Sequence, residues 1–288
     1  MITGVQVKPP RARPHGPPTP GDIALKLIGR DYLSYSSIST YQRCPLKFYF
    51  QYVLGLEPEF KSASLVFGGA IHKAIEHHYR KMFEGGAPPS VDDLVATYER
   101  AWRAEATRPV RFGKNESETT LRGLAHRMLT AFRASPVSKL DTTILGIEEE
   151  LRAPVIPDCP DVLGRIDLIH LDEQYLTILD FKTSRSRWTP AKIEESTPQM
   201  VLYADLAGPI AQACNDRPIR LQWVVLTKTK SPAIETHSID LDPRQLARTK
   251  LVFERVWQAI KNGAFYPSPS PMACSTCPFK KACQQWEG

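Results

Sequence analysis

Two short stretches, GRIDLI at residues 164–169 and ILDFKTS at residues 178–184, decide how the rest of the chain is interpreted. Each carries one carboxylate, Asp167 in the first and Asp180 in the second, and the pattern predicts two neighbouring strands. Side chains alternate between the faces of a strand, so Lys182 is expected on the same face as Asp180. Two acids and a lysine in one pocket can hold a divalent metal and stabilise a charged transition state. Phosphodiester hydrolysis requires this combination, which favours a metal-dependent nuclease.

The residues around this pair suit a hard divalent cation. Carboxylate oxygens favour Mg²⁺ or Mn²⁺, and His72, just after the Gly68-Gly69 pair, would shift the preference toward Mn²⁺. Each feature also has an ordinary interpretation: Asp-X-Lys can be a surface ion pair, and a lone histidine can simply lie on a helix surface. The acidic run at residues 148–150 is typical of a solvated edge strand, although one member could reach the metal.

Length and composition allow one large domain or two small ones. The chain has 288 residues, 42% of them apolar, and a formal charge of +6, which is compatible with nucleic acid without requiring it. No apolar run is long enough to span a bilayer, and no signal peptide is expected. The protein is therefore expected in the cytoplasm, away from membranes, where thiols stay reduced and its six cysteines indicate metal binding or burial.

The predicted organisation is a disordered tail followed by one domain. Residues 1–30 are proline-rich at their start and are predicted to be disordered, and residues 31–288 form the domain. Within it we expect a helical part at about 60–140, a sheet core at about 141–240, and a helix and cysteine-rich end at 241–288. This layout predicts an α/β fold.

Individual elements follow from periodicity and capping signals. Strands are expected at about 142–153, 161–170, 175–182, 220–227 and 234–240. Helices are expected at 46–54, after Gly68-Gly69, at 91–106, 117–134 and 197–212 (opening near Pro198), and after Asp242 up to Gly263.

Four cysteines have spacing that suits a metal. Cys274 and Cys277 form C-x₂-C, Cys283 follows after five intervening residues, and Cys44 lies 230 positions before Cys274. Four thiolates can bind an iron–sulfur cluster or a structural Zn²⁺ ion. A site shared by these residues would join both ends of the domain. The two other cysteines have no such spacing and are interpreted as buried or incidental thiols.

These motifs, in this order, resemble RecB-like nucleases of the PD-(D/E)XK superfamily, in particular the iron–sulfur branch. That branch includes CRISPR-associated RecB-like exonucleases and the AddAB nuclease domain. The resemblance covers residues 31–288, from the serine-rich entry ending at Cys44 through GGAIH at 68–72, GRID at 164–167, DFKT at 180–183 and QMVLY at 199–203 to the terminal cysteines. It implies a mixed central sheet flanked by helices, with a helical insertion and a cysteine-rich cluster site.

The resemblance also implies roles for individual residues. The metal ligands would be His72, Asp167, Asp180 and the backbone carbonyl of Phe181. The catalytic set would be Asp167, Asp180, Lys182, Gln199 and Tyr203, the last two sharing a helix face because they are four residues apart. Cys44, Cys274, Cys277 and Cys283 would hold a [4Fe–4S] cluster, with structural Zn²⁺ as the alternative.

DNA is the expected partner. Arg185, Arg187 and Trp188 follow the Lys182 strand and could contact phosphates and an unpaired base, or form only a solvated basic loop. No G-x-x-x-x-G-K-[ST] motif is present, so we expect action on exposed single strands or ends, or alongside a helicase or CRISPR integration partner. The resulting hypothesis is a metal-dependent DNA exonuclease, 5′→3′ on single strands, in repair, recombination, phage replication or CRISPR adaptation. The alternative is a non-catalytic DNA-binding or assembly module.

Overall fold

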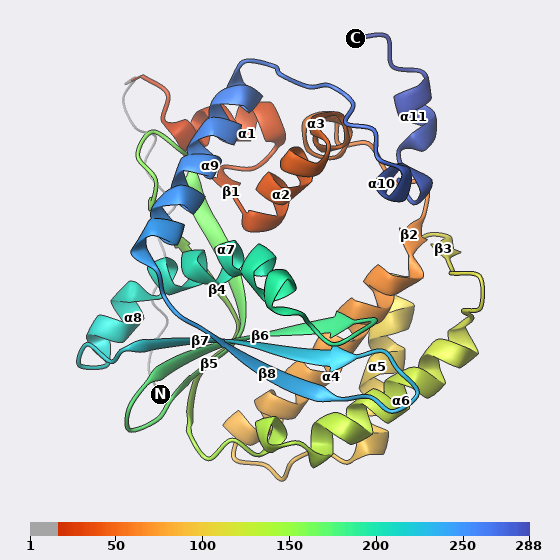
Figure 1. Ribbon diagram of the computed structural model, residues 1–288, viewed down its shortest axis with the longest axis vertical. Helices are drawn as coiled ribbons and strands as arrows, with labels where there is room; N and C mark the ends of the chain where they lie inside the picture. Colours follow the sequence, from red (N-terminus) through yellow and green to blue (C-terminus); the bar gives the residue numbers. More distant parts are fainter. Residues whose placement is uncertain (1–16) are drawn as a thin grey trace, which may run out of the picture.

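The two carboxylate-bearing stretches form adjacent strands at the centre of a six-stranded sheet (Figure 1). The computed structural model describes residues 17–288. The strands of this sheet, in chain order, are β1 (Tyr32–Leu33), β4 (Thr143–Ala153), β5 (Asp161–Leu171), β6 (Leu176–Ser184), β7 (Ile219–Thr227) and β8 (Ile234–Ile239). Two further short strands, β2 (Lys61–Ser62) and β3 (Val110–Arg111), pair with each other.

The sheet is mixed. Its order is β1-β5-β6-β7-β8, with β4 also paired to β5. Strand β5 is antiparallel to both β4 and β6 and parallel to the short β1, whereas β6 and β7 are parallel and β7 and β8 are antiparallel. The prediction of an α/β fold with a mixed central sheet is confirmed, and the five predicted strands lie within two residues of those observed.

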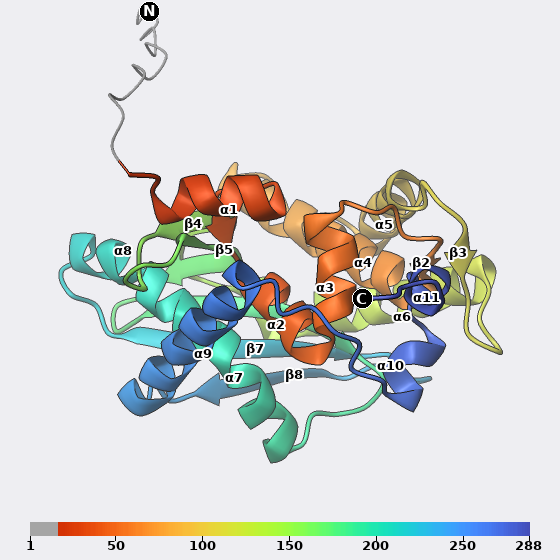
Figure 2. The ribbon, with the colours of Figure 1, turned by 90° about the horizontal axis from the view of Figure 1, so that it is seen from above.

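Helices cover both faces of the sheet. The helices are α1 (Pro20–Ile28), α2 (Tyr35–Arg43), α3 (Pro45–Phe48), α4 (Ala63–Phe83), α5 (Val91–Glu105), α6 (Glu118–Ala134), α7 (Pro190–Leu206), α8 (Gly208–Ala213), α9 (Pro243–Lys261), α10 (Pro271–Ser275) and α11 (Lys280–Gln284), with a π turn at Tyr49–Val53 and a 3₁₀ turn at Pro136–Lys139. One buried cluster joins α4, α5 and α6 to the sheet, and two others join it to α7, α9 and the N-terminal helices (Figures 1 and 2). None of the helices within residues 17–288 has the length and hydropathy of a bilayer span.

The prediction of a disordered tail over residues 1–30 is wrong for the last part of that range. Residues 20–28 form α1, while residues 1–16 lie outside the described residues. Thr19 and Asp22 exchange the hydrogen bonds of a capping box, and Pro20 occupies the first turn, where its missing N–H is tolerated. The helix is held because Ala24 and Ile28 are buried against the core beside α9.

Two predicted helix starts are also wrong. The helix carrying Gly68-Gly69 begins at Ala63, capped by the Ser62 side chain, so the glycines lie inside α4. Helix α7 begins at Pro190 and contains Pro198 in its interior. Proline there removes one backbone donor from the helix, but packing of the following turns against the sheet outweighs that loss.

The two ends of the described chain pack together. The Tyr41 hydroxyl donates to the Ala264 carbonyl oxygen at 2.5 Å, across 223 residues of sequence. Farther along, Leu46 and Phe50 share a buried cluster with Phe279, so α3 lies beside the α10–α11 segment (Figure 2). The sheet is therefore bordered on one side by a region made from both termini.

Candidate active site

The candidate carboxylates lie where β5 and β6 stop pairing. Their cross-strand pairing ends at Leu168 opposite Leu179, and the next residue on each strand is Asp167 or Asp180. From Asp180 to Ser184, β6 remains paired with β7 in parallel. The end of pairing leaves room for the two carboxylates to approach a common ligand, while β7 keeps the Asp180 backbone in place.

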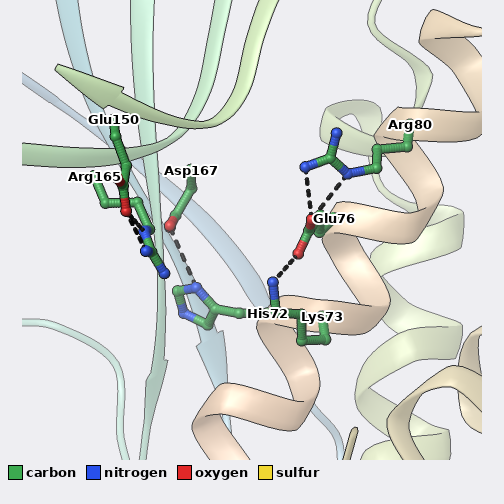
Figure 3. Close-up of polar contacts among 7 residues, drawn as sticks. All are labelled: His72, Lys73, Glu76, Arg80, Glu150, Arg165 and Asp167. Atoms are coloured by element: carbon green, nitrogen blue, oxygen red, sulfur yellow. Dashed lines mark hydrogen bonds and ion pairs between the residues drawn. The ribbon is translucent and has the colours of Figure 1, made fainter. Parts of the chain in front are cut away.

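Asp167 connects this fork to helix α4. Its Oδ2 atom accepts a hydrogen bond from the Phe181 backbone N–H at 2.7 Å and lies 3.4 Å from His72 Nδ1. Figure 3 shows the imidazole on α4 facing Asp167 on β5. The Asp167 carboxylate thus takes the place of a backbone hydrogen bond between β5 and β6, and it lies beside the imidazole nitrogen of His72.

Asp180 and Lys182 form the second half of the site. Lys182 Nζ lies 2.5 Å from Asp180 Oδ2 and 4.9 Å from the centre of the Trp223 ring. Gln199 Nε2 donates to Asp180 Oδ1 at 3.0 Å and lies 2.7 Å from the Tyr203 hydroxyl oxygen. Asp180 is only 2% exposed. Helix α7 therefore orients this carboxylate from one side while the lysine neutralises it from the other.

Burial and neighbouring charge shift the pKa values of the four ionisable groups. Burial raises the pKa of Asp180 to about 6, an effect that Lys182 opposes and Asp167 reinforces. Burial would also raise the pKa of Asp167, but the charges of His72 and Lys182 lower it overall. Conversely, the carboxylates raise the pKa values of His72 and Lys182 against the effect of burial. Such crowding of carboxylates in a poorly solvated site favours a bound cation.

The match to a known family covers nearly the whole described chain. The model of the PD-(D/E)XK nuclease superfamily matches residues 32–284. This chain belongs to the PD-(D/E)XK nuclease superfamily. A solved structure from Eubacterium rectale, named "Putative exonuclease", is similar in fold, with a TM-score of 0.55 and 13% identity over 92% of this chain and 90% of that one.

A more distant structure, of a protein named SSO0001, aligns with 13% identity over 86% of this chain and 94% of that one, at a TM-score of 0.33. No curated protein sequence matches the chain.

PD-(D/E)XK nucleases act on DNA and use divalent metals, and the donor set of this chain fits such an ion. His72 offers a nitrogen, and Asp167 offers a carboxylate oxygen 3.4 Å from it. Asp180 Oδ2 is buried and has no hydrogen-bond donor in the described part of the chain apart from its ion-pair partner Lys182. Oxygen ligands with one imidazole are typical of Mg²⁺ and Mn²⁺ sites.

Sequence reasoning gave no definite role to Glu148. Its carboxylate lies beside His72 and Asp167, and one ligand atom from each of the three falls within 4.8 Å of the others. The only sequence signal is the acidic run at 148–150. Three consecutive glutamates look alike in a sequence, so the member that faces the site could not be chosen without the backbone.

The three residues expected to contact DNA lie in different surroundings. Arg187 forms an ion pair with Glu235 at 2.8 Å. Trp188 is half-buried and packs against Trp223, with ring centres 5.3 Å apart. Arg185 is exposed and borders a separate cavity of about 260 Å³ on the α4 side of the sheet. Of the three residues, Arg187 is thus held by an ion pair and Trp188 by aromatic packing.

A larger cavity, of about 810 Å³, opens beside Lys182. It lies between α2, α7 and α9, and its wall includes Lys182, Gln199 and Trp188 together with the basic side chains Arg43 and Arg248. The smaller cavity near Arg185 is lined by residues of α4 and α6 and does not include Lys182. The candidate site is thus open toward the larger cavity.

The four motif cysteines surround one small cavity. Cys44, at the junction of α2 and α3, and the three cysteines of the α10–α11 segment line a space of about 180 Å³ walled by Leu46, Phe50 and Phe279. Within residues 17–288, no three of these sulfur atoms fall within 4.8 Å of one another.

Proposed function

We propose that this chain is a RecB-like, divalent-metal-dependent exonuclease that degrades single-stranded DNA from a 5′ end. The observation that carries the proposal is the position of two pairs at the fork between β5 and β6, His72 with Asp167 and Lys182 with Asp180. An imidazole, two carboxylates and a lysine match the requirements of metal-assisted phosphodiester hydrolysis. A chain acting only as a binding module would have no need of this set.

Each side chain of the site has a separate task. His72, Asp167, Asp180 and the Phe181 carbonyl would hold Mg²⁺ or Mn²⁺, which when bound polarises the phosphodiester and acidifies water. Lys182, beside Asp180, stabilises the negative charge that develops on the phosphate oxygens.

Gln199 and Tyr203 act through Asp180. The amide of Gln199 donates to Asp180 Oδ1, and the Tyr203 hydroxyl, next to that amide, limits its rotation. This pair fixes the carboxylate plane and leaves Oδ2 to the cation site. We therefore assign Gln199 and Tyr203 as positioning residues.

The strand path we propose crosses the end of β6. On one side, the cavity lined by Lys182 and Trp188 combines basic and aromatic side chains, as single-strand binding grooves do. On the other side, Arg185 and Lys228 line the smaller cavity, and neither forms an ion pair within residues 17–288. Burial and the nearby charge of Arg185 lower the pKa of Lys228. Arg185 and Lys228 lie close together without an ion pair, whereas Arg187 is paired with Glu235. We therefore favour Arg185 and Lys228 over Arg187 as phosphate contacts.

We further propose that Cys44, Cys274, Cys277 and Cys283 hold a [4Fe–4S] cluster. Support comes from the shared, apolar-walled cavity that all four cysteines line. Structural Zn²⁺ is the alternative occupant. The cluster would join residues 31–288 into one domain. Measuring the iron, acid-labile sulfide and zinc contents of anaerobically purified protein would distinguish the cluster from a zinc site.

Single-stranded substrate has to come from an exposed end or from an unwinding partner, such as a helicase or a CRISPR integration complex. The proposed polarity and substrate follow the RecB-like resemblance, and both are open to direct assay.

The test is cleavage of DNA labelled at one end. Anaerobically purified protein would be mixed with 5′- or 3′-labelled single-stranded and duplex DNA in Mn²⁺, Mg²⁺ or EDTA, next to Asp180→Asn, which is isosteric, and Asp180→Ala. We expect metal-dependent shortening of single strands by the wild type, with at least a 100-fold loss in both variants at unchanged circular dichroism. Cleavage by either variant at the wild-type rate would refute the assignment.

A further inference from the structure

We propose that Glu148 is a third carboxylate ligand of the divalent cation, together with His72 and Asp167. This inference rests on the metal-dependent function proposed above and adds a residue from outside the sequence motifs that indicate that function.

The distances suit a single ion. One ligand atom from each of Glu148, His72 and Asp167 lies within 4.8 Å of the other two. Ligands bound at about 2.1 Å to an octahedral ion lie about 3 to 4 Å apart. Small side-chain rotations would therefore bring all three atoms into one coordination sphere.

The backbone of β4 turns Glu148 toward that sphere. Glu148 lies opposite Asp167, because the flanking pairs are Ile147 with Leu168 and Glu149 with Ile166. Ile147 packs in the cluster on the α4 side of the sheet, so strict alternation would send the next side chain to the opposite face. Glu148 instead has φ of +52°, a rare value for a non-glycine residue in a strand, and this breaks the alternation.

The neighbouring glutamates face elsewhere. Glu150 is exposed and pairs with Arg165 across the strands (Figure 3). Glu149 is exposed and lies over Gly146. Of the three consecutive acids, only Glu148 reaches the metal site.

Glu148 also has no other partner. Within residues 17–288 it forms no hydrogen bond or ion pair, although it is half-buried beside the carboxylate of Asp167. The negative charge of Asp167 is unfavourable for an ionised Glu148 beside it, and a cation shared by the two carboxylates would remove that repulsion.

The experiment compares metal binding with stability in the absence of metal. Chelator-treated full-length protein would be titrated with Mn²⁺ by calorimetry, and its thermal unfolding followed in EDTA and in Mn²⁺. The variants are Glu148→Gln and Glu148→Asn, the latter chosen because asparagine tolerates positive φ and should fold. Glu150→Gln is the matched control.

We expect both Glu148 variants to raise the Mn²⁺ Kd by about tenfold or more. In EDTA they should melt at the wild-type temperature or above it, because the substitution removes a negative charge that repels Asp167. Their stabilisation by Mn²⁺ should be smaller than that of the wild type, and Glu150→Gln should bind Mn²⁺ like the wild type. Variants that bind Mn²⁺ within twofold of the wild type would overturn the Glu148 assignment alone. A wild type that binds no Mn²⁺ and cleaves no DNA would overturn the proposed function with it.

Discussion

Replacing Gly164 with alanine tests how closely α7 must approach the active-site strand. A Cβ atom at this position would lie 2.8 Å from Leu206 Cδ1 and 2.9 Å from Tyr203 Cε1. Ordinary carbon–carbon contacts are about 3.5 to 4.0 Å, so both side chains would have to move by more than half an ångström. Overpacking of a buried site costs about 1–3 kcal/mol, offset by about 0.4–1 kcal/mol from the less flexible unfolded chain. We therefore expect a net destabilisation of about 1–2 kcal/mol.

Urea unfolding followed by circular dichroism measures this change, and Gly69→Ala provides a control of opposite sign. Gly69 is exposed inside α4, with no atom within 4 Å of its would-be Cβ, so alanine there should stabilise by about 0.5–1 kcal/mol. Gly164→Ala should also slow cleavage, because moving Tyr203 disturbs Gln199. If Gly164→Ala unfolds at the same urea concentration as the wild type or a higher one, the close packing of α7 on β5 is not a constraint and this reasoning fails.

Two other predictions concern stability against pH and binding of DNA. Burial lowers the pKa of His78 to about 4, below its usual value of about 6.5. The free energy of unfolding therefore has its full contribution from neutral His78 above pH 6.5, and it decreases by up to about 3 kcal/mol as the pH falls to 4. Unfolding measured from pH 7.5 to 5 should show this slope, and His78→Gln should flatten it; an unchanged slope would assign the effect to other groups. Lys228→Met should raise KM for single-stranded DNA by about tenfold with little change in kcat, and reduce the salt dependence of binding, whereas the exposed Lys230→Met should do neither. Equal KM values for the two variants would remove Lys228 from the strand path.

The sheet was predictable because its signals are local. Strands β4 to β8 are marked by aliphatic runs and turn residues, and α9 by an N-cap at Asp242 and a glycine stop at Gly263. The missed helix α1 had its own signal, the Thr19 and Asp22 capping box, but the surrounding prolines dominated the composition. Pro198 lies inside α7 and does not open it, because the effect of a proline on a helix depends on tertiary packing, which no local pattern indicates.

The geometry of the candidate site was predictable only in part, for a related reason. The spacing of Asp180 and Lys182 is enough to expect a shared face, since strand periodicity is fixed. The surroundings of Trp188 and the orientation of Glu148 depend on neighbours distant in sequence and on one unusual backbone angle. Sequence patterns predict regular backbone well, but they do not indicate the positive φ of Glu148.

The contact between Tyr41 and Ala264 sets an order of events during synthesis. The helices α2 and α3 leave the ribosome early, but their partners on α9 and beyond come 223 residues later. At about 5–20 residues per second, this interval is about 10–45 s. During that time Phe48 and Ile38 lack the α9 side chains that complete their cluster, such as Phe253 and Trp257. The growing chain should therefore depend on chaperones and be sensitive to proteases until α9 is complete.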